Sequence, residues 1–400
     1  MIELADIERA RQALGDAIYL SPCARTQSLS EETGCDVFLK LENLQMTGSF
    51  KERGARNRLL SLDAAQRARG VIAASAGNHA QGVAYHARDL GIESTIVMPR
   101  STPLNKVMAT RRFGGEVVLH GESYDAAAAE ARRIADARDL VTIPAFDDDL
   151  VIAGQGTLGL ELLDQVEGLD AVVVPVGGGG LIGGVAVALK ERNPAIQVFG
   201  VEAAAIAAMR SAVDAGAVTT LPAARTIADG IAVRAVSERT RALCARYVDD
   251  VVTVDEEELA RAVLVLIERE KSVAEGAGAA ALAGLLQGKL PVAGKRVALL
   301  VSGGNIDVNL LARIIDRGLR RSGRSVRVEV ALPDVPGALA RLLEVIATEG
   351  ANVLSVQHDR IGARAGVDVT SVELVLETRG FDHIEQLHAG LRSAGYALEP

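Results

Sequence analysis

Short apolar segments rich in valine and isoleucine alternate with alanine-rich segments through most of this chain. Continuous apolar strands separated by helices of this length are typical of parallel sheets covered by helices on both faces. The alternation occurs in two blocks, which predicts an α/β fold of two lobes with a ligand site at the carboxyl ends of the strands. The expected strands are Gly70–Ala74, Ser94–Met98, Glu116–Leu119, Ala171–Val176, Gln197–Val201 and Arg296–Val301, and the expected helices are Gln81–Asp89, Leu104–Phe113, Leu181–Lys190 and Leu310–Arg320.

Length and charge narrow the class of protein further. With 400 residues the chain exceeds the size at which one hydrophobic core keeps growing, so two or three domains are expected. A net charge of -9 without a dense basic run argues against nucleic acid as a partner. The aromatic content of 3%, with no tryptophan, leaves few surfaces on which bases could stack.

The cysteines and the apolar runs indicate the compartment. Cys23, Cys35 and Cys244 are widely spaced and form no C-x-x-C pair, so a reducing cytoplasm is expected rather than a disulfide framework or a zinc site. The first residues form an acidic amphipathic pattern and not a signal peptide. The uncharged stretch Ala171–Leu189 contains Pro175 and six glycines, which favours a buried strand, turn and helix over a membrane span.

One lysine follows a tight glycine turn. The turn contains Gly48, Ser49 and Phe50, and Lys51 comes next, where a helix is expected to begin with Thr47 or Ser49 as its cap. At that position burial and the positive end of the helix dipole both disfavour the ammonium form, which predicts a lowered lysine pKa. Such a lysine is suited to imine formation with an aldehyde.

Three glycine-rich turns follow apolar strands. The segment 75–82, Ser-Ala-Gly-Asn-His-Ala-Gln-Gly, can bind a carboxylate with the backbone N–H groups at a helix start. The four glycines Gly177–Gly180 can surround a phosphate in the same way. The third turn, 302–305, reads Ser-Gly-Gly-Asn and ends another buried strand.

The four motifs, in this order, resemble those of the fold-type II pyridoxal phosphate enzymes, and most closely the threonine dehydratases (threonine ammonia-lyases). The resemblance covers residues 1–320 and implies a fold like that of the tryptophan synthase β subunit, with a smaller lobe at about 52–148 inserted in the larger lobe. It implies pyridoxal 5'-phosphate as the cofactor. It also implies conversion of L-threonine to 2-oxobutanoate and ammonia, and of L-serine to pyruvate.

The resemblance also assigns roles to residues. Lys51 would hold the cofactor as a Schiff base and then remove the Cα proton of the substrate, before the β-hydroxyl leaves. Asn78 would bind the ring oxygen of the cofactor, and Ser302 would face its pyridine nitrogen without forcing a proton onto it. The phosphate would be bound by Gly177, Gly178, Gly179, Gly180 and Leu181, and the substrate carboxylate by backbone groups of Ser75, Ala76 and Gly77.

Beyond an arginine-rich linker at residues 321–325, the pattern changes to strands with one polar face. The order βαββαβ over residues 326–400, including strands at Asn352–Ile361 and Asp368–Thr378, is that of the ferredoxin-like motif. This part resembles an ACT domain, a small regulatory module that often binds amino acids. The resemblance implies a homodimer or homotetramer whose activity responds to isoleucine or valine. The regulatory residues that it suggests are Asp334, Gly337 and Asn352.

Four further candidates receive no role. His79 can simply pack or bind backbone, and Asp147–Asp149 is read as a solvated loop. Glu202 matches a cation-binding position of some relatives, but no carboxylate follows in the next six residues, so no metal is predicted. For Glu275, a place beside the cofactor and a helix cap are equal explanations.

Other functions fit parts of the sequence. Gly178–Gly183 satisfies G-x-G-x-x-G and Glu202 follows at the distance of a ribose-binding acid, as in a nicotinamide oxidoreductase, but Lys51 would then have no task. Serine racemase is an alternative within the same family, although relatives that racemise carry a hydroxyl where this chain has Ala76. The stretch Ile152–Thr157 speaks against a β-replacement enzyme, and an intact Lys51 against a non-catalytic amino-acid sensor.

Overall fold

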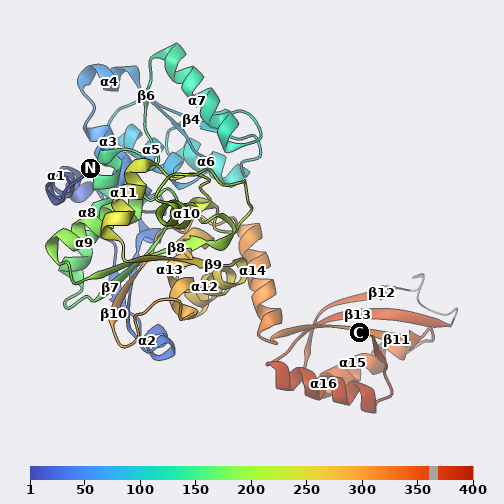
Figure 1. Ribbon diagram of the computed structural model, residues 1–400. Coiled ribbons are helices and arrows are strands. Elements are labelled where there is room, and N and C mark those ends of the chain that lie inside the picture. Colours follow the sequence, from blue (N-terminus) through green and yellow to red (C-terminus); the bar gives the residue numbers. More distant parts are fainter. Residues whose placement is uncertain (360–367, 400) are drawn as a thin grey trace. The chain divides into compact units, whose positions relative to one another are not determined.

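The structure is a computed structural model that describes residues 1–359 and 368–399. It divides into two compact units, Met1–Val308 and Asn309–Pro400 (Figure 1). Within the described residues no helix is both long enough and apolar enough to cross a membrane.

The first unit contains a six-stranded sheet in the order β1-β2-β10-β7-β8-β9. Strand β1 pairs antiparallel with β2, and all other neighbours are parallel. The central strand β7 is buried at every position, as its continuous run of valines predicts. The strands are β1 (Cys23–Arg25), β2 (Asp36–Leu41), β7 (Ala171–Pro175), β8 (Gln197–Ala203), β9 (Asp250–Val254) and β10 (Arg296–Val301).

A second sheet in this unit has four parallel strands in the order β5-β4-β3-β6. It forms a smaller lobe at the top of Figure 1. Parallel sheets in two lobes confirm the predicted fold class. The strands are β3 (Val71–Ala74), β4 (Ser94–Met98), β5 (Glu116–Leu119) and β6 (Val141–Thr142), and the helices of this region are α3 (Lys51–Leu60), α4 (Ala64–Arg69), α5 (Asn78–Asp89), α6 (Leu104–Arg112) and α7 (Tyr124–Arg138).

Helix α8 (Asp149–Gln165) lies between α3 and α9 (Gly180–Arg192), and glycines allow the close approach. A Cβ at Gly154 would lie 2.7 Å from the Cα of Gly54 in α3, and one at Gly156 would lie 2.9 Å from the carbonyl oxygen of Gly184 in α9. The glycines of the stretch Ile152–Thr157 are therefore helix-packing residues. Helix α8 thereby fixes the distance between the helix that starts at Lys51 and the helix that starts at the four-glycine loop.

The other helices of the first unit pack against the larger sheet or against helices beside it; α1, for example, packs against α8. They are α1 (Leu4–Leu14), α2 (Gln27–Thr33), α10 (Ala208–Ala215), α11 (Glu238–Tyr247), α12 (Glu256–Glu268) and α13 (Gly276–Leu286), with the short 3-10 helices η1 (Gly15–Ala17), η2 (Glu42–Leu44), η3 (Ala204–Ile206) and η4 (Asp229–Ile231).

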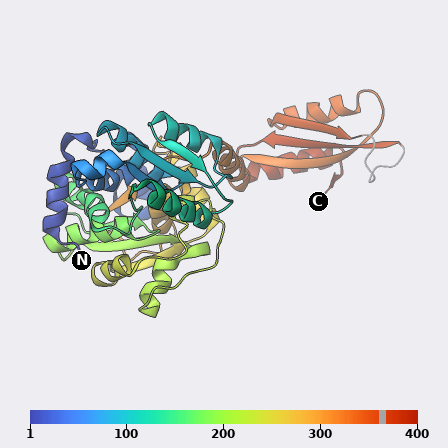
Figure 2. The same cartoon turned by 90° about the horizontal axis from the view of Figure 1, so that it is seen from above.

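The second unit contains an antiparallel sheet in the order β12-β13-β11-β14. Helices α15 and α16 lie on one face of this sheet in both views (Figures 1 and 2). Buried and more exposed residues alternate along β13, as expected for a sheet covered on one side. The order confirms the predicted βαββαβ motif. The elements are α14 (Val308–Arg321), β11 (Ser325–Pro333), α15 (Ala338–Thr348), β12 (Asn352–Asp359), β13 (Val369–Glu377), α16 (Phe381–Ser393) and β14 (Leu398–Glu399).

Two boundaries differ from those expected. Helix α14 extends to Arg321, so residues 322–324 separate it from β11, and the compact units divide after Val308. Arginines near a helix C-terminus are favoured by the helix dipole, so the arginine-rich composition is compatible with a helix end as well as with a linker. The last two residues of the expected strand Asn352–Ile361 lie outside the described residues.

Candidate active site

Lys51 is the first residue of α3 and lies beside the end of β10. The N–H of Phe50 donates to the carbonyl of Ser302 at 3.1 Å, and Ser49 forms a β-bridge with Gly303. These backbone contacts join two predicted motifs that are about 250 residues apart in sequence. They place Lys51 and Ser302 at the same end of the larger sheet.

The Lys51 side chain is partly buried, and its Nζ donates to the carbonyl of Ala145 at 2.9 Å. Burial lowers the pKa of Lys51 to about 8, against a smaller opposing influence of the Glu275 carboxylate. The sequence predicted a lowered pKa, and burial is its main cause. Near neutral pH a fraction of this lysine is therefore an unprotonated amine, the form that reacts with an aldehyde.

The loop Gly177–Gly180 connects β7 to α9, whose first amides have no acceptor within the helix. Side chains surround this loop closely. A Cβ at Gly178 would overlap the ring of Phe146, and one at Gly177 would lie 2.9 Å from the Cα of Ile231. Gly179 has φ of +87°, which other residues adopt at a cost. Free amides on a loop without side chains fit a bound phosphate.

Asn78 begins α5 at the end of β3, and both ends of its amide are held. Its Nδ2 donates to Oε1 of Glu275 at 2.5 Å, and its Oδ1 accepts from Nδ2 of Asn305 at 2.8 Å. Nδ2 of Asn305 also donates to the carbonyl of Thr47 at 2.8 Å. Three of the four predicted motifs thus meet around Asn78.

Ser302 directly follows β10 and is 3% exposed, so it lies in the interior beside Phe50 and Lys51. The segment Ser75–Gly77 is half-buried between β3 and α5. The N–H of Ser75 donates to Val97, and the N–H of Gly77 donates to Oγ of Ser75 at 3.2 Å. Binding of the substrate carboxylate by backbone groups of Ser75, Ala76 and Gly77 remains a prediction.

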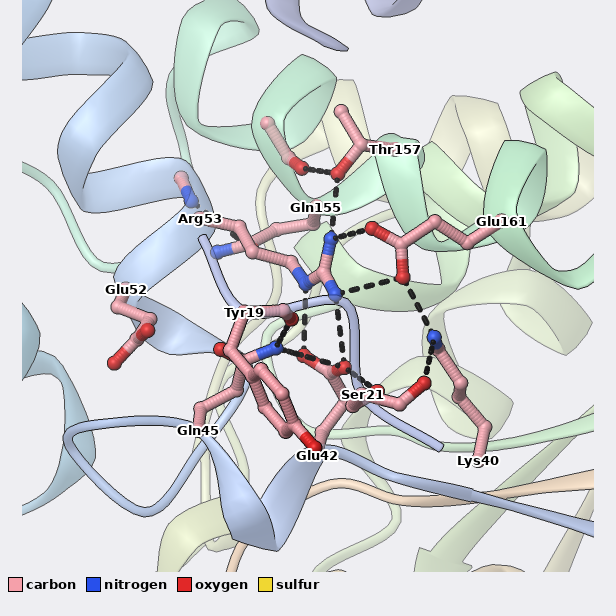
Figure 3. Close-up of polar contacts among 12 residues, drawn as sticks. Tyr19, Ser21, Lys40, Glu42, Gln45, Glu52, Arg53, Gln155, Thr157 and Glu161 are labelled. Atoms are coloured by element: carbon pink, nitrogen blue, oxygen red, sulfur yellow. Dashed lines mark hydrogen bonds and ion pairs between the residues drawn. The ribbon is translucent and has the colours of Figure 1, made fainter. Parts of the chain in front are cut away.

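Behind Lys51 lies a buried ion cluster, which we define as Lys40, Glu42, Arg53 and Glu161 (Figure 3). Arg53 is 1% exposed, and its guanidinium donates to both oxygens of Glu42 and both oxygens of Glu161. Lys40 joins the cluster through Glu161 at 2.6 Å. These bonds anchor the first turn of α3, and with it Lys51, to the larger lobe. No local sequence pattern had indicated this cluster.

The pKa values of the buried ion cluster follow from its pairing. Burial alone would raise the pKa of Glu42, but the Arg53 guanidinium outweighs burial and holds that pKa below its ordinary value. Burial would lower the pKa of Arg53, but the carboxylates of Glu42 and Glu161 raise it instead. Glu42 and Arg53 therefore favour their charged forms together.

His79 and Asp147–Asp149, to which no role was assigned, form bonds within the fold. Nε2 of His79 lies 2.9 Å from the carbonyl of Ile143, and burial lowers the pKa of this histidine to about 4. Asp148 caps α8 through the amides of Leu150 and Val151. Asp147 and Asp149 form ion pairs with Arg239.

Glu202 accepts the backbone N–H groups of Met209 and Arg210, both at 2.8 Å. Its carboxylate thus holds the start of α10, and burial raises its pKa to about 7. In a nicotinamide oxidoreductase these oxygens would bind a ribose, but here they accept backbone N–H groups of the same chain. Within residues 1–359 and 368–399 no three metal-binding side chains come together.

An open cavity of about 340 Å³ adjoins the motifs. Gly48, Gln81 and Asn305 line it on the side of the site, and Lys106 and Arg112 of α6 line it on the other. Lys106 forms an ion pair with Asp229 of η4 at 2.6 Å, so it links the smaller lobe to the larger. The cavity lies beside the motif residues Gly48 and Asn305, while Lys51, Asn78 and Ser302 do not line it.

In the second unit, the three suggested regulatory residues are exposed. The N–H of Asp334 donates to Asp368, and Gly337 lies just before α15. Asn352 begins β12 and donates to Glu377 at 3.3 Å.

Two lobes of parallel sheet, with a reactive lysine and a phosphate-binding loop at the carboxyl ends of their strands, are the arrangement of fold-type II pyridoxal phosphate enzymes. Residues 14–303 match the family described as pyridoxal-phosphate dependent enzyme, and residues 326–389 match the ACT domain. The chain belongs to this cofactor-dependent family and carries a C-terminal ACT domain. Pyridoxal 5'-phosphate is therefore its cofactor.

Individual relatives are similar over most or all of the chain. The L-threonine ammonia-lyase of Thermotoga maritima is 48% identical over 398 residues, which cover 100% of this chain and 99% of the relative. Threonine deaminase isoform 2 of Solanum lycopersicum is similar in structure, with a TM-score of 0.74, 36% identity, and coverage of 78% of this chain and 91% of that one. Maize serine racemase has a TM-score of 0.75, 33% identity, and coverage of 80% and 98%.

Proposed function

We propose that this chain is a threonine ammonia-lyase, a lyase that converts L-threonine to 2-oxobutanoate and ammonia, with L-serine to pyruvate as a slower reaction. The similarity to the Thermotoga maritima enzyme over the whole chain supports this substrate class. The observation that carries the reaction is Lys51, a partly buried amine of lowered pKa that directly follows Phe50, whose N–H donates to Ser302. The same site, with Asn78 and the four-glycine loop, fits the cofactor.

Bound pyridoxal 5'-phosphate supplies the electron-withdrawing ring that acidifies the Cα proton of the attached amino acid. Lys51 would hold the cofactor through its aldehyde carbon. Once the substrate amine replaces Lys51 at that carbon, the freed lysine amine would be close enough to take the Cα proton. The amides of Gly177–Leu181 would hold the phosphate, and the second N–H of Asn78 Nδ2 would bind the ring oxygen. Ser302 provides a neutral partner for the ring nitrogen.

Steady-state kinetics on L-threonine and L-serine, with the keto acids identified by mass, tests the proposal. We expect a higher kcat/KM for L-threonine. A preference for L-serine would overturn the choice of substrate but not the type of reaction. Absence of either keto acid from protein that has bound the cofactor would overturn both.

Serine racemase remains the second candidate because of the structural similarity to the maize enzyme. Racemisation needs a proton donor on the face of the substrate opposite Lys51, and position 76 carries alanine instead of a hydroxyl residue. Chiral chromatography of L-serine incubated with the protein distinguishes the two, since elimination gives pyruvate without D-serine. Replacing Ala76 with serine should then allow some D-serine to form.

The ACT domain suggests regulation and assembly. We expect the chain to form a homodimer or homotetramer. We also expect it in the cytoplasm, since all three cysteines are free thiols. Isoleucine or valine is expected to bind near Asp334, Gly337 and Asn352, where the amides at the start of α15 can donate to a carboxylate. Calorimetric titration of both amino acids into the full chain, and into the Asn352→Ala variant, tests this. If neither binds the full chain, the ACT domain serves another purpose.

A further inference from the structure

Glu275 is a buried carboxylate whose purpose the sequence leaves open between a helix cap and a cofactor neighbour. It is 4% exposed and directly precedes α13, but its side chain makes no capping hydrogen bond there. Its N–H donates to the carbonyl of Gly303 at 3.1 Å. The side chain therefore points away from its own helix and toward the predicted motifs.

The Glu275 carboxylate fills a space that two glycines leave open. Its Oε1 accepts from Nδ2 of Asn78 at 2.5 Å. A Cβ at Gly303 would lie 2.6 Å from the same oxygen, and one at Gly230 would lie 3.3 Å from it. A side chain at position 303 would displace the carboxylate from Asn78, so the Ser302-Gly-Gly motif also serves to admit Glu275.

The hydrogen bonds determine how the Asn78 amide is oriented. Its Oδ1 accepts from Asn305, and one Nδ2 hydrogen goes to Glu275. An amide nitrogen carries two hydrogens, so one N–H of Asn78 is left to donate to a ligand. Without Glu275 this amide would lose the acceptor that decides which way its nitrogen points.

Charged groups from three other elements act on Glu275. Burial and Asp229 of η4 raise its pKa to about 7, while Lys106 of α6, the Asn78 hydrogen bond and Lys51 of α3 act in the opposite direction. In return, the Glu275 carboxylate raises the pKa of Lys51 against the larger effect of burial. The two groups are therefore coupled electrostatically.

We propose that Glu275 is a positioning residue of the cofactor site: it orients Asn78 toward the ring oxygen of the cofactor, and its negative charge tunes the reactivity of Lys51. The inference deepens the proposed function and rests on it. Loss of the charge alone should make the Lys51 ammonium group easier to deprotonate. Loss of the whole side chain should also release Asn78.

Cofactor capture by cofactor-free protein tests both parts without any amino-acid substrate. Stopped-flow absorbance gives the capture rate as a function of pH, and equilibrium titration gives the cofactor dissociation constant. The variants are Glu275→Gln and Glu275→Ala, with Glu270→Gln as the matched control. Glu270 lies five residues earlier, and its carboxylate accepts a hydrogen bond from Thr26.

In the wild-type protein the capture rate should rise with pH through the pKa of Lys51, about 8. Glu275→Gln should move that midpoint to lower pH by at least about half a unit, because a neighbouring negative charge is gone. Its capture rate near pH 7 should therefore be higher than that of the wild type. Glu275→Ala should in addition raise the dissociation constant roughly tenfold, since a hydrogen bond to a charged group is lost. Glu270→Gln should change neither quantity.

An unchanged midpoint in folded Glu275→Gln protein would overturn the effect on Lys51. An unchanged dissociation constant in folded Glu275→Ala protein would overturn the orientation of Asn78. If the Glu275→Ala variant does not fold, Asn305→Ala takes its place, because it frees the other end of the Asn78 amide. Its cofactor dissociation constant then decides whether the orientation of Asn78 matters for cofactor binding. A wild-type protein that captures cofactor but does not consume L-threonine would instead count against the proposed function.

Discussion

Lys51, which is partly buried, and Arg53, which is fully buried, are separated by one residue at the start of α3, and their surroundings are opposite. Arg53 is bonded to two carboxylates, which raise its pKa. Lys51 donates to a neutral carbonyl, and burial lowers its pKa to about 8. Full pairing keeps the arginine charged and fixed, whereas the lack of a directly bonded carboxylate leaves the lysine able to give up its proton. Perturbed pKa values of this kind are typical of functional sites.

The largest effect is expected from Lys51→Ala, which removes both the covalent attachment and the base. Turnover of L-threonine should fall by several orders of magnitude. The folded state of the cofactor-free variant should be at least as stable as the wild type, because a poorly paired buried ammonium is gone. Steady-state kinetics of the variant and the wild type with cofactor measures turnover. Thermal unfolding of both proteins without cofactor measures stability. Near-normal turnover would contradict the assigned role.

Arg53→Met should have the opposite effect on stability: it should destabilise the folded state. It leaves Glu42 and Glu161 buried without their main partner, so the free energy of unfolding should drop by about 3–5 kcal/mol. Arg239→Met is the control, because that arginine pairs with Asp147 and Asp149 at the surface and its loss should cost about 0–1 kcal/mol. Urea unfolding of both variants measures the difference. Equal losses would mean that the buried ion cluster contributes no more than a surface pair.

Gly179→Ala tests the phosphate loop at a smaller scale. At φ of +87° an alanine is strained, and its Cβ would lie 2.9 Å from the Cβ of Thr240. The loop should shift, and the cofactor dissociation constant should rise roughly tenfold for about 1–2 kcal/mol of strain. Gly216→Ala has similar strain at φ of +68° in open space, away from the loop. Equilibrium titration should show normal cofactor affinity in Gly216→Ala. Weakened affinity in this control would mean that backbone strain anywhere in the chain lowers cofactor binding.

The last effect is a pH dependence of stability in the cofactor-free protein. The pKa of Lys51 is about 8 when folded, against an ordinary value of 10.5, so the unfolded chain binds more protons between these values. The contribution of Lys51 to stability should therefore rise with pH from about 8 to 10.5. The contribution of Glu275 should fall between its ordinary value of 4.5 and about 7, because there the folded state binds more protons.

Comparison with Lys51→Ala isolates the lysine contribution. The stability advantage of this variant over the wild type should shrink as the pH is raised above about 8. Chemical unfolding at several pH values gives the two curves. A constant difference across this range would mean that the folded-state pKa of Lys51 is not lowered.

The sequence predicted the fold class and the elements that carry the motifs, since these depend on local patterns. Strand β10 has the predicted bounds Arg296–Val301, and β4 those of Ser94–Met98. Continuous valine runs are sufficient for buried parallel strands. The helix cap was predicted wrongly: Phe50 precedes α3 without a capping side chain, and Oγ1 of Thr47 donates to Glu52 instead.

What the sequence could not predict are the pairings between distant residues. Arg53 and Glu161 are 108 residues apart, and Asn78 and Glu275 are 197 apart. Local periodicity carries no information about which charges meet once the lobes fold. Asn305 ends the motif at residues 302–305, and of that motif only Ser302 was assigned a role, so the bond between Asn305 and Asn78 was not predicted. The assigned roles of the motif residues themselves remain predictions.

Borohydride reduction of the cofactor-loaded protein, followed by peptide mapping, tests most directly whether Lys51 is the reactive cation. Reduction makes the attachment of the cofactor permanent, so the peptide that contains Lys51 should carry its mass, and Lys51→Ala should carry none. Lys40, the buried lysine of the ion cluster, provides the internal comparison and should remain unmodified. Cofactor found on Lys40 or on another lysine, or no covalent attachment at all, would contradict the account.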